Sequence, residues 1–220
     1  MNIQNLVLEL PPLLGLLGSM FFVYKYKHFS SLGYIIGWFI VFTTVCEMYA
    51  RYTVVMQGSN LIGLHIYTLG QFIFCSFFFY HLFKLLKWEY FKIWYIYIGI
   101  GLIIFNSVFI QKIEIFNSYS KTAVQFIFII LCFMGYFLLT LKEYDHWDKS
   151  AVKIIISAIL LSSAASLTLY LFSNQIMTLE QSMQRKIWMI NVGCNILVQV
   201  LYIYALAMMV IVKKRFDLEK

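Results

Sequence analysis

Two oppositely charged side chains, Glu47 and Arg51, lie inside one apolar run of this 220-residue chain. Residues four apart share one face of an α-helix, and a carboxylate that precedes a guanidinium by four residues favours an ion pair. A charged group costs about 2.5–3.5 kcal/mol at the centre of a membrane-spanning helix, so it normally faces the helix bundle or a water-filled cavity. The pair is therefore either a local structural contact or the charged part of a binding site.

Further polar side chains recur in the other apolar runs, toward the side of the membrane that we assign below as the outer one. They are Glu9, His65, Gln71, Asn106, Gln125, Asn191 and Asn195. Such groups could join helices through hydrogen bonds of about 0.6–2 kcal/mol each. Packing contacts should be spread through the bilayer, so concentration on one side favours an outward-facing pocket for a small polar or charged ligand. For His65 taken alone, a structural hydrogen bond is the favoured role.

Enzymatic chemistry has little support in the sequence. The four histidines form no HExxH or HxxxH pair, the predicted spans contain no Asp, and no GxSxG is present. No lysine lies in the middle of the last apolar run, so a retinal Schiff base has no anchor. We expect a protein without enzymatic activity, cofactor or metal; an acid–base pair of Glu47 and His65 is the one catalytic alternative.

Composition gives the class of protein. Hydrophobic residues make up 62% of the chain, charged residues 12%, and mean hydropathy is +0.80, whereas soluble domains hold about 45–50% apolar and about 25% charged residues. Stretches such as 154–161, in which every residue except Ser157 is apolar, exclude the alternating pattern of membrane β-strands. The four cysteines form no CxxC pair, and the scattered basic residues form no nucleic-acid-binding motif. The sequence predicts an all-α, multi-pass membrane protein with the lipid bilayer as its solvent.

Seven apolar runs are long enough to cross a hydrocarbon core of about 30 Å. They lie at about 6–24, 32–55, 61–83, 92–110, 117–140, 152–173 and 187–212. The first run has no basic residues before it, so it is expected to remain in the mature protein rather than act as a signal peptide. The whole chain is predicted to be one integral membrane domain in a plasma membrane of the bacterial inner-membrane type.

The orientation follows from the positive-inside rule. Of the 17 Lys and Arg residues, twelve lie near 25–31, 84–92, 142–153 and 213–220, four lie in the alternate connections, and Arg51 lies within a run. The first set is therefore cytoplasmic. This places the N-terminus outside and the C-terminus inside, with 213–220 as a basic cytoplasmic tail.

Two short matches suggest an internal repeat. Tyr26–Phe29 and Tyr144–Trp147 both read Tyr-x-His-aromatic, and Thr68–Gly70 resembles Asn191–Gly193 at nearly the same offset. They suggest a three-plus-one-plus-three arrangement of parallel repeats, although matches this short also arise by chance. This layout resembles that of small seven-helix solute transporters such as the sugar transporters with proline–glutamine loops. Those families have a proline in both repeats, whereas this chain has only Pro11 and Pro12, so the resemblance is architectural and assigns no residues.

These observations favour a solute-binding membrane protein, either a transporter or a sensor. A sensor would need a separate output partner, because the short connections leave no room for a soluble signalling domain. Two alternatives stay open: an oligomerising accessory, effector or pore-forming protein, and a membrane scaffold subunit of a larger complex. The partners that we expect are therefore lipid, a small polar ligand, and either a second copy of the chain or another protein.

Overall fold

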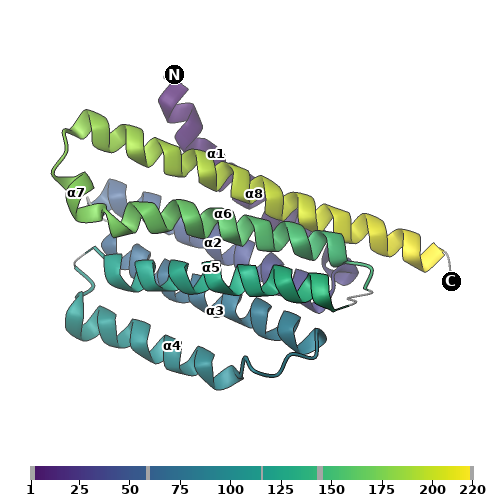
Figure 1. Ribbon diagram of the computed structural model, residues 1–220. Coiled ribbons are helices and arrows are strands. Elements are labelled where there is room, and N and C mark those ends of the chain that lie inside the picture. Colours follow the sequence, from purple (N-terminus) through teal and green to yellow (C-terminus); the bar gives the residue numbers. More distant parts are fainter. Residues whose placement is uncertain (1–2, 58–59, 115, 143–145, 219–220) are drawn as a thin grey trace.

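The structure, a computed structural model, describes residues 3–57, 60–114, 116–142 and 146–218. These ranges form helices and connections without a strand, which confirms the predicted all-α class (Figure 1). The α-helices are α1 (Ile3–Lys25), α2 (Ser31–Gln57), α3 (Leu61–Leu85), α4 (Ile93–Phe105), α5 (Ser118–Leu141), α6 (Lys149–Leu171), α7 (Ser173–Met177) and α8 (Gln181–Leu218). A 3-10 turn (Tyr26–His28) follows α1, and a π-helical turn (Asn106–Ile110) continues α4.

Six helices in the described part of the chain are long and apolar enough to cross a membrane, which is the architecture of a multi-pass membrane protein. They coincide with the last six of the seven predicted runs. The candidate spans are Ser31–Thr53, Leu61–Leu85, Ile93–Ile110, Ser118–Leu141, Lys149–Leu171 and Gln181–Phe216. The first predicted run, 6–24, corresponds to α1, which lies alongside α2 and α8.

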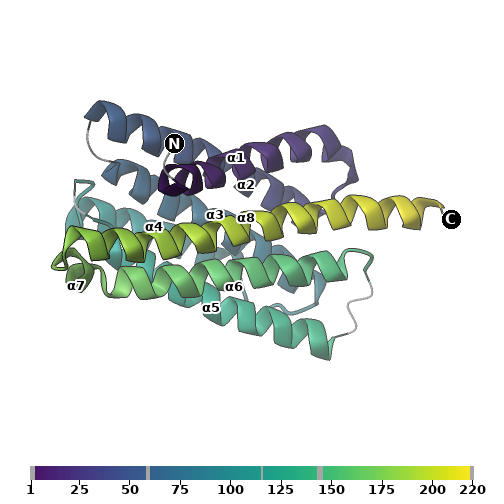
Figure 2. The same cartoon turned by 90° about the horizontal axis from the view of Figure 1, so that it is seen from above.

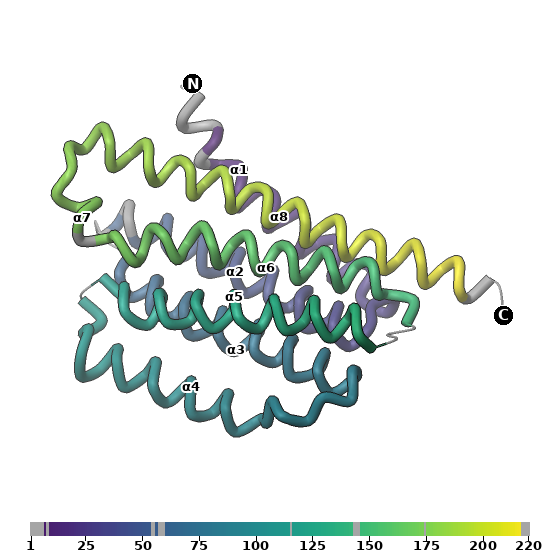
Figure 3. The backbone as a smooth tube through the Cα atoms, viewed as in Figure 1, coloured from purple at the N-terminus to yellow at the C-terminus, as the bar shows by residue number. Residues whose placement is uncertain are grey.

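Helix α8 is longer than the predicted run at 187–212. It has 38 residues, begins at Gln181 and continues through most of the predicted tail to Leu218, while residues 219–220 lie outside the described part. Its polar first turns (QSMQRK) contain good helix formers, so the helix extends beyond the apolar stretch that hydropathy detects. The backbone trace shows its C-terminal turns projecting past the other helices (Figure 3).

Six helices form a closed ring. Neighbours around it are α1, α2, α3, α5, α6 and α8, and α8 returns to α1; α2 and α8 also touch across the ring. Helix α4 packs at the edge of the bundle against α3 (Figure 1), and a view from above shows α8 between α1 and α6 (Figure 2). The ring therefore encloses an interior to which five helices other than α1 bring polar side chains.

The apolar core fills one half of this interior. It contains fully buried residues from the beginnings of α2 and α6 and from the later turns of α3, α5 and α8, including Ile36, Phe79, Phe128, Ile155 and Leu206. Most of the buried polar residues gather instead near the end of the bundle at which α3, α5 and α8 begin. We call this the cavity end, and the other the tail end.

Close helix contact at Gly37 gives a stability prediction. Gly37 on α2 faces the ring of Phe22 on α1, which is 1% exposed, and an added Cβ would overlap that ring. We expect Gly37→Ala to destabilise the fold by about 1–3 kcal/mol, the usual cost of overpacking, and to lower the melting temperature of the purified protein in mild detergent. Gly101→Ala is the matched control, because an added Cβ there meets nothing within 4 Å. Equal melting temperatures for the two variants would contradict this packing.

Candidate functional site

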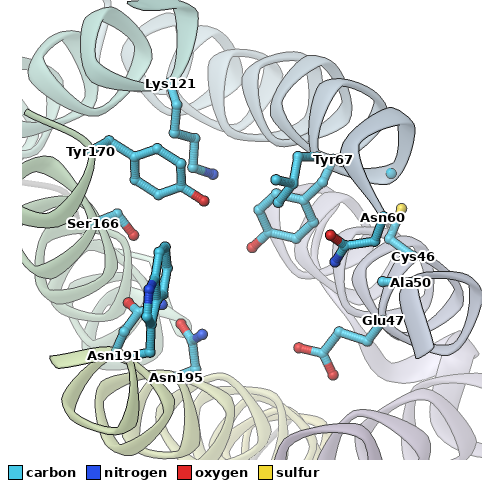
Figure 4. Close-up of a pocket in the computed structure, with 13 residues that line it drawn as sticks. Cys46, Glu47, Ala50, Asn60, Tyr67, Lys121, Ser166, Tyr170, Asn191 and Asn195 are labelled. Atoms are coloured by element: carbon cyan, nitrogen blue, oxygen red, sulfur yellow. The ribbon is translucent and has the colours of Figure 1, made fainter. Parts of the chain in front are cut away.

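A polar cavity of about 210 Å³ lies inside the ring at the cavity end. Five helices contribute to its wall: α2, α3, α5, α6 and α8. The lining residues are Cys46, Glu47, Ala50, Asn60, Gly63, Leu64, Tyr67, Lys121, Ser166, Tyr170, Trp188, Asn191 and Asn195. Figure 4 shows carboxylate, ammonium, phenol and amide groups directed into one space. A volume of this size corresponds to about seven water molecules at about 30 Å³ each, so the cavity suits a small molecule.

Glu47 supplies the negative charge of the wall. Its side chain projects from α2 into the cavity (Figure 4), and its Oε2 atom is buried without a hydrogen-bond partner among the described residues. An unsatisfied buried oxygen is unfavourable, and an ionised one more so. The sequence-based expectation that Glu47 faces the interior therefore agrees with its position, and its free oxygen is available to a donor.

Lys121 supplies the positive charge on the opposite wall (Figure 4). It comes from the first turn of α5, is only 3% exposed, and donates a hydrogen bond of 2.5 Å from Nζ to Oε1 of Gln71. Its ammonium also lies 4.3 Å from the ring centroid of Tyr67 and 5.7 Å from that of Tyr170. Aromatic faces attract cations, so an amide and two rings hold Lys121 in place, and none of these three groups carries a counter-charge.

Neutral polar groups line the space between these two charges. The hydroxyls of Tyr67 and Tyr170 point inward, as do the amides of Asn191 and Asn195 (Figure 4). Oδ1 of Asn191 is buried and has no hydrogen-bond partner in the part of the chain that the structure describes. Between the two charges the wall thus offers both donors and acceptors to a bound molecule.

A smaller cavity of about 20 Å³ lies deeper in the ring. It shares Glu47, Tyr67 and Asn195 with the main cavity, and Gln199 of α8 is also in its wall. Oε1 of Gln199 has no hydrogen-bond partner among the residues described. The row of amide side chains on α8, Asn191 and Asn195, therefore continues with Gln199 one turn further toward the apolar core.

Gln71 and Gln125 lie behind Lys121 rather than in the cavity wall. Oε1 of Gln71 accepts hydrogen bonds from both Lys121 and Nε2 of Gln125, the latter at 3.0 Å. Both amides are buried. These two predicted site residues thus position the ammonium, and the wall itself contains three of the nine predicted residues: Glu47, Asn191 and Asn195.

The local ion pair of Glu47 with Arg51, one of the two interpretations of their spacing, is not found within ion-pair distance. Arg51 instead contacts Glu9 on α1, with 2.5 Å between the guanidinium and the carboxylate, and both side chains are substantially exposed. The i, i+4 spacing indicates only which contacts are possible within α2. Packing of α1 on α2 brings a second carboxylate, that of Glu9, to the guanidinium of Arg51. Glu9 and Arg51 therefore join two helices outside the cavity wall.

His65 and Asn106 take part in contacts at the edge of the ring. Nδ1 of His65 is hydrogen-bonded to Oγ of Ser107 at 2.8 Å, which links α3 to the π-helical turn after α4. Asn106 donates to Oε1 of Gln111 at 3.5 Å, and Gln111 in turn accepts from the backbone of Tyr119 at the start of α5. Neither residue lines the cavity, and the structural role favoured for His65 fits its position.

Sequence reasoning missed Lys121 and the aromatic part of the wall. Lys121 was counted with an outer connection because it is close to the polar segment before α5. The useful signal was its spacing, since Lys121 and Gln125 stand four apart on one helical face. Tyr67 stands between His65 and Gln71 in the same run, whereas Tyr170 and Trp188 carried no comparable signal in a chain that is 19% aromatic.

The assembled groups can bind a polar molecule through charge and hydrogen bonds. Comparison with known protein families, curated proteins and solved structures finds no match to this chain. In the described ranges, no three His, Cys, Asp or Glu side chains come close enough together to hold a metal ion. The chemistry of the cavity itself is therefore what points to a function.

Proposed function

We propose that this protein binds a small polar solute in the cavity, from outside the cell, as a transporter or a sensor of an inner-membrane type. The observation that carries the proposal is the cavity at one end of the ring, with Glu47 and Lys121 on opposite walls. Ionisable residues within membrane-spanning helices are costly and characteristically mark ligand or ion sites. Two such residues facing one space of about 210 Å³ fit a binding site better than helix packing alone.

The proposed topology has seven spans, with the N-terminus outside and the C-terminus in the cytoplasm. Helix α1 has 23 residues, or about 35 Å at 1.5 Å per residue, which is sufficient to cross the hydrocarbon core. Basic residues such as Lys25, Lys87, Lys142 and Lys213 belong to the tail end, which the positive-inside rule assigns to the cytoplasm. Burial of Lys121 inside the bundle removes one basic residue from the outer connections and so supports this orientation.

The order of the helices in the ring is compatible with the proposed repeat. Exchanging α1 with α5, α2 with α6 and α3 with α8 maps each pair of ring neighbours onto another pair of ring neighbours. Helix α4 lies outside the ring, where a linker between two three-helix repeats would lie. Part of the Tyr-x-His-aromatic match lies outside the described residues, because 143–145 are not among them. The cavity would then lie between the two repeats, as in other repeat-built transporters.

Placement of the polar residues favours solute binding over assembly into a pore. A pore formed by several copies needs a polar stripe on the outside of each copy, facing the symmetry axis. Here the polar groups of five helices face the interior of a single ring, while many large hydrophobic side chains are exposed on the outside, as lipid contact requires.

A binding screen tests the proposed function. Purified full-length protein in mild detergent is heated in the presence of small polar metabolites: sugars, amino acids, amines, carboxylates and nucleosides. A ligand that binds only the folded state raises the melting temperature. We expect at least one class to do so, and Glu47→Gln to remove the shift. Glu114→Gln, an exposed position at the same end of the bundle, should retain it. No shift with any class, or a full shift in Glu47→Gln, would overturn the proposal.

A further inference from the structure

We infer that the ligand of this cavity is a small zwitterion of the amino-acid type, whose carboxylate binds Lys121 and whose ammonium binds Glu47. The inference rests on the proposed function, since it names the chemical class of solute that the same cavity would take. Three features carry it: the pairing state of the two charges, their placement, and the size of the space between them.

Neither charge has an ion-pair partner in the part of the chain that the structure describes. Within the described residues, no Lys, Arg or His lies within ion-pair distance of Glu47, and no Asp or Glu lies within that distance of Lys121. Arg51, the nearest basic residue along α2, forms its ion pair with Glu9 and acts on Glu47 only from beyond ion-pair distance. Buried charges are normally paired, because an isolated one loses hydration without compensation. Each wall of the cavity therefore presents a charge that a ligand can satisfy.

The signs of the two charges select the ligand. A cation would pair with Glu47 and leave Lys121 unpaired, and an anion would do the reverse. A neutral sugar would satisfy hydrogen bonds but neither charge. A molecule that carries one positive and one negative group pairs with both, and site and ligand are then each neutral overall. Charge complementarity of this kind discriminates strongly, because a wrong ligand leaves a buried charge uncompensated.

Placement and size limit the ligand further. The two charged groups face each other across the cavity, with the hydroxyls of Tyr67 and Tyr170 and the amides of Asn191 and Asn195 around the space between them (Figure 4). The volume of about 210 Å³ is below the range of about 300–1,000 Å³ that is usual for drug-sized ligands. An amino acid with its side chain fits such a space, whereas a dinucleotide or an oligosaccharide does not.

Matched ligands test the inference with the wild-type protein alone. The twenty common L-amino acids are screened by thermal shift, and the dissociation constant of the best one is measured by titration calorimetry. Three relatives of it follow: the amine without the carboxylate, the carboxylic acid without the amino group, and the methyl ester. We expect each relative to bind at least tenfold more weakly than the amino acid. Equal binding of any relative would overturn the inference.

Two variants then assign each charge. In Lys121→Met, the amino acid should bind no better than its decarboxylated amine. In Glu47→Gln, it should bind no better than its deaminated acid. Failure of this pattern with folded variants would overturn the assignment of carboxylate to Lys121 and ammonium to Glu47. If a sugar, amine or carboxylate binds and no amino acid does, the inference fails while the proposed function stands. If no compound of any class binds, both fail.

Discussion

Replacing Gln71 by leucine is expected to destabilise the protein by about 2–3 kcal/mol. Gln71 accepts the hydrogen bond of the buried Lys121 ammonium and also that of Gln125. A hydrogen bond to a charged group contributes about 1.5–3 kcal/mol, and a buried donor left without an acceptor keeps its full desolvation cost. The melting temperature of Gln71→Leu in mild detergent should therefore fall clearly below that of the wild type.

A second substitution identifies the cause of that loss. Lys121→Met in the Gln71→Leu background removes the unpaired charge, and replacing both partners by apolar groups is close to neutral. The double variant should recover much of the lost stability. Gln199→Leu is the matched control, because Oε1 of Gln199 has no hydrogen-bond partner among the described residues; its melting temperature should be unchanged or higher. If the double variant is less stable than Gln71→Leu, the two residues are not coupled as the structure shows.

The proposed orientation predicts an all-or-none labelling result. Glu114 is exposed in the connection before α5 at the cavity end, and Glu89 is exposed between α3 and α4 at the tail end. In a background without the four native cysteines, the Glu114→Cys variant should react with a membrane-impermeant maleimide on intact cells. The Glu89→Cys variant should react only after the membrane is permeabilised. Retained thermal stability of the cysteine-free background is the control for folding.

The reverse labelling pattern would overturn the orientation and place the cavity on the cytoplasmic side. Labelling of both positions on intact cells would contradict a fixed arrangement of the helices across the membrane. Neither outcome would alter the cavity itself, because its lining residues are set by packing within the ring. The side from which a ligand enters is thus tested separately from its binding.

The spans could be predicted from sequence because hydropathy is summed over about twenty residues in each of them, and lipid requires such segments to be apolar and helical. The position of Glu47 was also predictable, since a carboxylate in an apolar run is driven toward the interior. The partner of Arg51 was not, because Glu9 lies 42 residues earlier and approaches only when α1 packs on α2. Sequence spacing predicts contacts within one helix, whereas the packing of helices against each other decides which of the possible ion pairs forms.

Lys121 shows the same limit at the end of a helix. Hydropathy places helix ends only to within a few residues, and a lysine near an end can equally belong to a loop or to a first turn. The structure puts it in the first turn of α5, within the predicted run at 117–140, and buries it. Burial of this side chain, rather than a shift of the helix end, makes a charge counted for topology into half of the charged site.

The length of α8 gives the protein a mechanical property. At 1.5 Å per residue its 38 residues measure about 57 Å, against about 30 Å of hydrocarbon. The side chains that α8 buries in the core lie between Val198 and Met209, and we treat this stretch as the pivot of a rigid helix. The arm before it carries Asn191, and the arm after it carries Lys213, which contacts the backbone of Lys27.

The first arm, from Gln181 to Val198, is about 26 Å long, and the second, from Met209 to Leu218, is about 14 Å long. If a solute draws the end of the first arm inward by about 2 Å, the end of the second swings outward by about 1 Å. Under the proposed function, solute binding at the cavity end is therefore expected to displace the tail end of α8.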